Sequence, residues 1–134
     1  MALAQHDPSL FHQRGNVAIE YGLVLPVMLL FILGIVDTGR LLWTYTTLQR
    51  AVEAAARCGV VNTTLCASTA LIQSKAVTEA WGVPITTSAV TVTTATCGVQ
   101  VSATYAFTSI IPWFAATAAP SSTLTLTPTA CYPV

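Results

Sequence analysis

Charge is the scarcest feature of this 134-residue sequence. Ten residues are charged, five basic and five acidic, which is 7% of the chain, whereas a soluble globular domain carries roughly 25%. The basic residues are scattered and the net charge is zero, so the sequence lacks the clustered cations that bind nucleic acid. Because 54% of the residues are hydrophobic, the chain has enough apolar surface to bury, and intrinsic disorder is excluded as well.

Histidine is nearly absent too, and none follows His12. A Ser-His-Asp or Cys-His catalytic site therefore cannot form from the later part of the chain. Glu53 and Glu79 are the only acids after Asp37. A two-carboxylate enzyme site built from them is an alternative, but a solvated surface role is the favoured interpretation. We expect no catalytic residue and no cofactor.

Charge is missing from two long stretches that differ in kind. The sixteen residues 21–36 have no charge and almost no polar side chain. The last 55 residues, from Ala80 onward, also have no charge, but they are rich in Thr and Ser that alternate with apolar residues. The first pattern favours a membrane segment. The second is typical of strands with one buried face.

A transmembrane helix needs about 20 mostly apolar residues. Residues 17–36 reach that length only if Glu20 is included, and an ionised acid costs about 2.5 to 3.5 kcal/mol near the bilayer centre. Such an acid is a functional-site hypothesis by default. The alternative is that the membrane begins at Tyr21 and that Glu20 lies among the lipid head groups.

The helical pattern continues beyond the apolar stretch. A signal peptide would be followed by a small-residue cleavage site, but a helical face follows instead. The sequence therefore predicts one helix over residues 17–57, with a kink or local unwinding near Gly22 and Pro26, because proline removes a backbone donor and clashes with the preceding turn. The predicted apolar face of the second half consists of Leu41, Tyr45, Leu48, Val52 and Ala55.

All four cysteines follow the apolar stretch, at Cys58, Cys66, Cys97 and Cys131. An even number in a small domain favours disulfides and an oxidising compartment, so residues from about 38 onward should face the periplasm or the exterior. Three pairings are open. The expected topology favours Cys97–Cys131 at one edge of a sheet and Cys58–Cys66 across the turn between two helices. A zinc site is the competing interpretation, although no Cys-x-x-Cys is present.

The exported part is predicted to be α+β. A second helix should begin at Ser68 or Thr69, end at Ala80 or Trp81, and be terminated by Gly82. Its predicted apolar side consists of Leu71, Ile72, Ala76, Val77 and Ala80. Strands are predicted at residues 90–93, 99–107 and 123–127, forming a three-stranded antiparallel meander that packs on both helices. Trp113 and Phe114, beside Pro112, are a candidate contact patch.

Residues 14–26, Arg-Gly-Asn-Val-Ala-Ile-Glu-Tyr-Gly-Leu-Val-Leu-Pro, resemble the amino terminus of the TadE/TadG-like pseudopilins of tight-adherence (Flp-type, type IVb) pilus systems. These proteins have a short polar leader ending in Gly, then four residues, then Glu and an aromatic residue at the start of an apolar helix. Residues 34–40 and 51–58 also resemble the helix of that family. The resemblance covers residues 14–58.

This resemblance implies roles for particular residues. Gly15 would be the last residue of the leader and Asn16 the first of the mature chain, after cleavage by a membrane-embedded prepilin peptidase on the cytoplasmic side. Glu20 and Tyr21 would act in assembly. In related pilins, the carboxylate at the position of Glu20 is thought to meet the new amine of a neighbouring subunit, and pairing lowers the cost of an acid in the membrane.

We therefore expect a leader (1–15), a transmembrane segment (16–37), a protruding helix (38–57) and a disulfide-stapled α+β head (58–134). The resemblance implies a minor pilin or pseudopilin without chemistry of its own. Its expected partners are the peptidase, other pilins and pseudopilins, the membrane assembly platform and membrane lipid. We place it in the bacterial inner membrane as a single-pass protein with a periplasmic head, or outside the cell within a pilus. The alternative is an unprocessed single-pass protein whose periplasmic head is a binding module.

Overall fold

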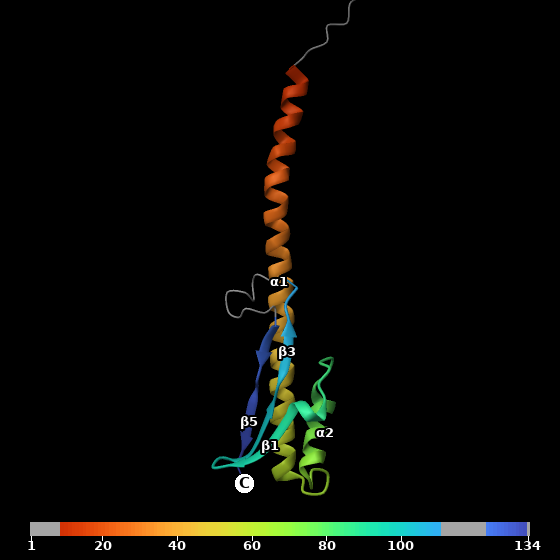
Figure 1. The fold of residues 1–134 in the computed structure, drawn as a ribbon, viewed down its shortest axis with the longest axis vertical. Coiled ribbons are helices and arrows are strands. Elements are labelled where there is room, and N and C mark those ends of the chain that lie inside the picture. The colour runs from red at the N-terminus through yellow and green to blue at the C-terminus, as the bar shows by residue number, and fades with distance from the viewer. Residues whose placement is uncertain (1–8, 111–122, 134) are drawn as a thin grey trace, which may run out of the picture. The chain divides into compact units, whose positions relative to one another are not determined.

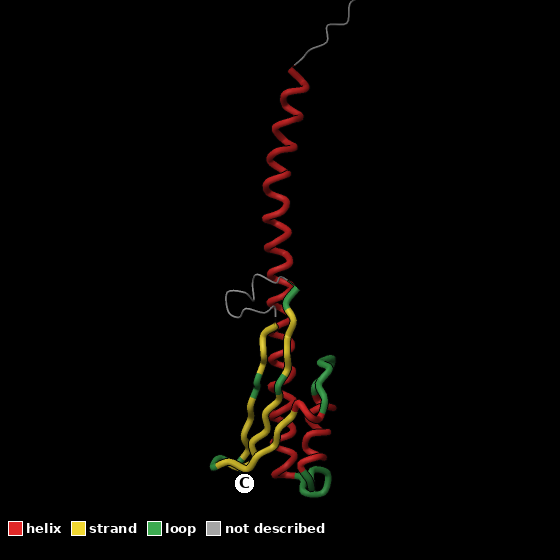
Figure 2. Tube along the Cα trace, viewed as in Figure 1, coloured by secondary structure: helices red, strands yellow, loops and turns green. Residues whose placement is uncertain are grey.

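The structure is a computed structural model that describes residues 9–110 and 123–133, with side chains from Ile19 onward. It divides into two compact units, Met1–Val36 and Asp37–Val134. The first unit contains the beginning of one long helix. The second contains the rest of that helix, a shorter helix and the strands (Figures 1 and 2). The predicted α+β class is confirmed.

The long helix, α1, spans Ser9–Val61. The predicted helix over residues 17–57 is therefore correct but too short at both ends. No proline interrupts the sequence between Pro8 and Pro26, so nothing in residues 9–16 forbids the helical conformation. α1 continues through Gly22 and Pro26 without a break in its helical assignment. The bend of its axis at these residues stays a prediction.

The second unit has a hydrophobic core built around the last four turns of α1. Leu48, Val52 and Ala55 are completely buried, as predicted, and Ala51 and Ala56 join them. The prediction for Tyr45 is wrong, because its side chain is 44% exposed. Thr44 is buried in that part of the helix instead, and its hydroxyl donates to the Arg40 carbonyl at 2.8 Å, which satisfies its polar group.

The shorter helix, α2, spans Thr69–Glu79; it begins as predicted and ends one residue before the predicted end at Ala80 or Trp81. Ser68 is its N-cap and accepts a hydrogen bond from the backbone N–H of Leu71, which satisfies one of the free donors of the first turn. Gly82 follows the helix with φ of +70°. On its predicted apolar side Ile72, Ala76 and Ala80 are buried, whereas the Leu71 prediction is wrong because that side chain is 46% exposed.

A three-stranded antiparallel sheet is present, as predicted, and consists of β1 (Val90–Ala95), β2 (Gly98–Ala103) and β5 (Thr129–Tyr132) in that order. The prediction of 123–127 as its third strand is wrong, because that segment pairs in a separate sheet. A 3₁₀ turn, η1 (Thr87–Ala89), comes directly before β1. Two further strands, β3 (Tyr105–Thr108) and β4 (Thr123–Leu126), pair with each other in a second, two-stranded sheet.

The two sheets share one hairpin. β2 pairs with β5 and β3 pairs with β4 in the same register, with Ser102 opposite Thr129 and Tyr105 opposite Leu126. The N–H of Ala103 donates to the carbonyl of Pro128 at 3.1 Å, but proline has no N–H to return the bond. The predicted strand 99–107 is therefore one extended segment that is interrupted near Thr104, opposite a proline that interrupts its partner.

Both favoured disulfides are present. Cys58–Cys66 closes the turn between α1 and α2, with 5.8 Å between the Cα atoms. Cys97–Cys131 joins the turn between β1 and β2 to β5, with 6.2 Å between the Cα atoms. Because all four cysteines are oxidised, no thiolate is left for the zinc alternative. Gly98 beside the second disulfide has φ of +119°, and a Cβ there would lie 2.1 Å from the carbonyl oxygen of Tyr132, so only glycine fits.

Candidate functional site

The first unit presents an uncovered apolar surface. α1 is the one helix within the described residues that is long and apolar enough to cross a membrane. Its large apolar side chains are exposed from Ile19 to Val36, with exposed fractions between 42% and 72%. Water would be a poor solvent for such a surface, because each buried apolar side chain is worth about 1.5 to 3 kcal/mol. Lipid or other apolar helices are the surroundings that suit it.

Two rows of side chains on this surface enclose a shallow apolar groove of about 450 Å³. They follow the four-residue spacing of one helix face. No polar residue lines the groove, which therefore suits an acyl chain or an apolar side chain. The rows consist of Leu23, Val27, Phe31 and Ile35 on one side and Val24, Met28 and Ile32 on the other.

Glu20 and Tyr21 lie on α1 just before this groove, and both are exposed. Among the described residues, no group forms a hydrogen bond or ion pair with the side-chain carboxylate of Glu20. Gly15 and Asn16 lie within α1 as backbone, one to two turns earlier. The structure thus places the four residues on one continuous helical segment, and their predicted roles in cleavage and assembly stay predictions.

The second unit begins with a buried acid that the sequence analysis gave no role. Asp37 is only 5% exposed. Its carboxylate accepts hydrogen bonds from the hydroxyl of Ser109 and from the backbone N–H of Ile110 at 3.2 Å, and it pairs with Arg40 at 3.4 Å. The guanidinium of Arg40 lies 5.5 Å from the ring centroid of Phe107, within cation–π range.

This cluster ties the first turn of the second unit to the end of β3. A charged group is buried at low cost only when it is paired and hydrogen-bonded, and Asp37 is both. The spacing of Asp37 and Arg40 was a signal in the sequence, since residues three apart meet on a helix. The contact with Ser109 could not be predicted from a local sequence pattern, because Ser109 lies 72 residues away.

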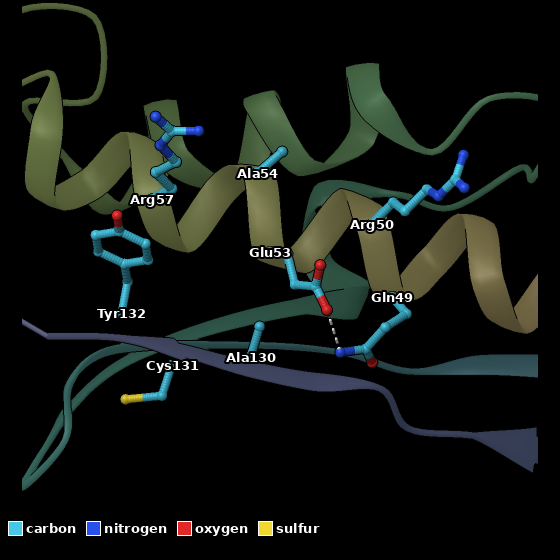
Figure 3. Close-up of a pocket in the computed structure, with 8 residues that line it drawn as sticks. All are labelled: Gln49, Arg50, Glu53, Ala54, Arg57, Ala130, Cys131 and Tyr132. Atoms are coloured by element: carbon cyan, nitrogen blue, oxygen red, sulfur yellow. Dashed lines mark hydrogen bonds between the residues drawn. The ribbon is translucent and has the colours of Figure 1, made fainter.

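A second groove, of about 620 Å³, lies between α1 and β5 (Figure 3). Gln49 and Glu53 point from the helix toward the strand, with Gln49 Nε2 donating to Glu53 Oε1 at 2.8 Å, while the guanidinium of Arg57 points away. None of its lining residues is buried. It is a shallow polar surface. The full lining is Gln49, Arg50, Glu53, Ala54, Arg57, Ala130, Cys131 and Tyr132.

Glu53 and Glu79, the two acids of the enzyme alternative, each interact with a different neighbour and not with each other. Glu53 accepts from Gln49, and Glu79 forms an ion pair with Lys75 on α2. Each acid is bound to a neighbour on its own helix, so the described residues offer no paired-carboxylate arrangement. The other candidate from the sequence, the patch of Trp113 and Phe114, lies outside the described residues.

Comparison with known proteins found a family match within α1. Residues 15–57 match the family model for TadE-like proteins. The match confirms the resemblance seen in the sequence and covers about a third of the chain, from the predicted cleavage site to the last turns of α1. No curated protein and no solved structure matches the chain.

TadE-like proteins are a structural, pilus-associated family. The match therefore suggests that this chain is associated with a tight-adherence pilus. The α+β part that follows residue 57 lies outside the matched region, so its role has to be argued from its own structure.

The Asp37 cluster leads to a stability prediction. Asp37→Ala should lower the free energy of unfolding by about 2 to 3 kcal/mol, because a partly buried N–H and a hydroxyl lose a charged acceptor. Asp37→Asn should cost less, since it keeps one acceptor oxygen. The measurement is denaturant unfolding of the full chain in detergent micelles.

The matched control is Glu79→Ala. Its ion pair with Lys75 is about 40% exposed on both sides, and exposed pairs contribute at most about 1 kcal/mol. Equal losses for Asp37→Ala and Glu79→Ala would show that the cluster contributes no more than a surface pair.

Proposed function

We propose that this protein is a minor pilin or pseudopilin of a tight-adherence, type IVb pilus, and that it acts by helix packing without chemistry of its own. The observation that carries the proposal is the match of residues 15–57 to TadE-like proteins, which begins at the expected cleavage position. The exposed apolar surface from Ile19 to Val36 supports it, because that surface needs lipid or other helices to cover it.

Processing is the first part of the proposal. A prepilin peptidase removes residues 1–15 and leaves Asn16 as the new amino terminus. The bond between Gly15 and Asn16 lies within α1, so the helix has to unwind there before cleavage. Glycine is a poor helix former, about 1 kcal/mol worse than alanine, which makes opening at this position easier.

Assembly is the second part. Glu20 lies four residues after Asn16, about one helical turn, on a helix whose neighbouring side chains are apolar and exposed. In a membrane its carboxylate is costly alone and far less so when it is paired. The new amine of a neighbouring pilin supplies a charge of the right sign. Such a pair fixes the axial register of one helix against the next.

The location follows from the same proposal. Residues from Ile19 to Val36 span the bacterial inner membrane, and the disulfide-linked second unit lies in the periplasm, where disulfides persist. The partners are the peptidase, other pilins and pseudopilins, the assembly platform and membrane lipid. After assembly the second unit is carried outside the cell.

Cleavage is predicted to depend on the peptidase and on Gly15. The intact mass of the membrane-bound protein should lack residues 1–15 in cells with the peptidase and include them in cells without it. Gly15→Val should block the loss of mass, because the bulky side chain occupies the position before the cleaved bond. Gly22→Val is the matched control, since a Cβ there meets nothing within 4 Å, and it should be processed normally. An unprocessed chain in both strains would favour the alternative of a single-pass protein with a binding module.

Glu20 is predicted to be essential for assembly but not for processing. Glu20→Ala and Glu20→Gln should both insert and be cleaved normally, yet abolish piliation, because neither side chain supplies a charge for the amine. Pili counted by electron microscopy give the readout, and mass spectrometry checks the cleavage. The control Glu79→Ala removes an exposed acid from α2 and should leave piliation unchanged. Normal piliation of the Glu20 variants would refute the pairing role.

A further inference from the structure

Two exposed tryptophans in the second unit have no role in the function proposed so far. Trp81, which follows α2, is 79% exposed, more than any other large hydrophobic side chain among the described residues. Trp43 on α1 is 54% exposed. Tryptophan is highly buried on average, and its apolar ring with one N–H donor suits a surface that is apolar on one side and wet on the other.

A close contact at Gly82 holds the loop of Trp81 against Trp43. A Cβ at Gly82 would lie 2.7 Å from Cη2 of the Trp43 ring, so that ring lies directly on the glycine backbone. Gly82 also has φ of +70°, a conformation that glycine adopts without steric cost. Figure 1 shows the loop between α2 and η1 projecting beyond both elements toward the first residues of this unit. We call Trp43, Trp81 and Gly82 the indole patch.

The indole patch lies near the start of the second unit. Trp43 is six residues after Asp37, which is about 9 Å along a helix at 1.5 Å per residue. Helical side chains lean toward the amino terminus, so the indole lies nearer to Asp37 than its Cα does. The uncharged apolar stretch ends at Val36, and the head-group layer of a bilayer extends roughly 5 to 8 Å beyond the hydrocarbon.

The charges around the indole patch do not oppose contact with lipid. Glu79 is the acid nearest to Trp81 in the sequence, and its charge is paired with Lys75. Arg40, one turn before Trp43, has a side chain that is 48% exposed, and its guanidinium suits a lipid phosphate. Tryptophan itself is enriched in the head-group region of membranes.

We propose that the indole patch binds the head-group layer of the membrane that α1 spans and so holds the second unit against the lipid surface before assembly. The proposal rests on the membrane-spanning part of the proposed function. Its commitment to lipid comes from two observations: Trp43 lies seven residues after the end of the apolar stretch, and the ring of Trp43 contacts Gly82, the residue next to the exposed Trp81.

The test is quenching of tryptophan emission by brominated lipid. The full chain carrying Trp43→Phe and Trp113→Phe, in which Trp81 is the only tryptophan, is reconstituted in phosphatidylcholine vesicles whose acyl chains are brominated close to the head groups. We expect the emission of Trp81 to be weaker than that of the same variant in unbrominated vesicles. We also expect its emission maximum to lie at a shorter wavelength than in denaturant. Should Trp43→Phe disturb the fold, the variant Trp81→Phe with Trp113→Phe reads the same contact from Trp43.

Two controls in a background without native tryptophans make the result decisive. Leu65→Trp replaces a side chain that is 69% exposed, in the turn after the end of α1, and it should keep its emission. Phe31→Trp places an indole within the apolar stretch and should be quenched if α1 spans the bilayer.

The three measurements separate the two proposals. Quenching of both Trp81 and Phe31→Trp, with Leu65→Trp unquenched, supports the lipid contact. Quenching of Phe31→Trp alone overturns it and leaves the indole patch facing water or another subunit, while the proposed function stands. If neither Phe31→Trp nor Trp81 is quenched, the spanning helix and the lipid contact both fail.

Discussion

α1 carries exposed apolar side chains in its first half and a buried apolar face in its second half, and the rest of the structure depends on that change. Between Ile19 and Val36 the large side chains of α1 are exposed and apolar, with no covering element among the described residues. Between Leu48 and Ala56 the same helix supplies the centre of a protein core. The change falls at Asp37, whose buried carboxylate is satisfied by Ser109, Ile110 and Arg40. Apolar side chains thus stay uncovered in one part of the helix and form a protein core in the other.

The second unit is small, and it combines several devices to keep a stable fold. The Cys97–Cys131 disulfide joins residues 34 positions apart in the sequence and the Cys58–Cys66 disulfide residues 8 positions apart, and both restrict the unfolded chain. Glycine permits the tight turn at Gly98 and the close contact at Gly82. The strands carry threonine instead of charge on their exposed faces, so covering these faces would not remove ions from water.

Local patterns predicted much of this architecture. Ser68 and Gly82 marked the ends of α2, and alternation marked the strands. Predictions failed where the result depended on distant contacts. Tyr45 and Leu71 had suitable helical spacing, but none of the elements that the structure describes covers them, and both are exposed.

The rest of the sheet and the candidate site show the same limit. The prediction ended the last strand at residue 127 and missed β5, because proline is unusual inside a sheet and Pro128 follows. The partners of Asp37 come from a segment far along the chain, which no periodicity reveals. The roles of Gly15 and Glu20 came from the resemblance, since a glycine and an acid five residues apart are a weak signal alone.

In the proposed function, another subunit supplies the charge that pairs with the carboxylate of Glu20. The most direct measurement is photo-crosslinking in piliated cells from a benzoylphenylalanine in place of Tyr21, beside that carboxylate. We expect adducts with the processed amino-terminal segment of a pilin, and we expect these adducts to be lost when Glu20→Gln is added. Adducts with lipid alone, or adducts that are unchanged by Glu20→Gln, would contradict it.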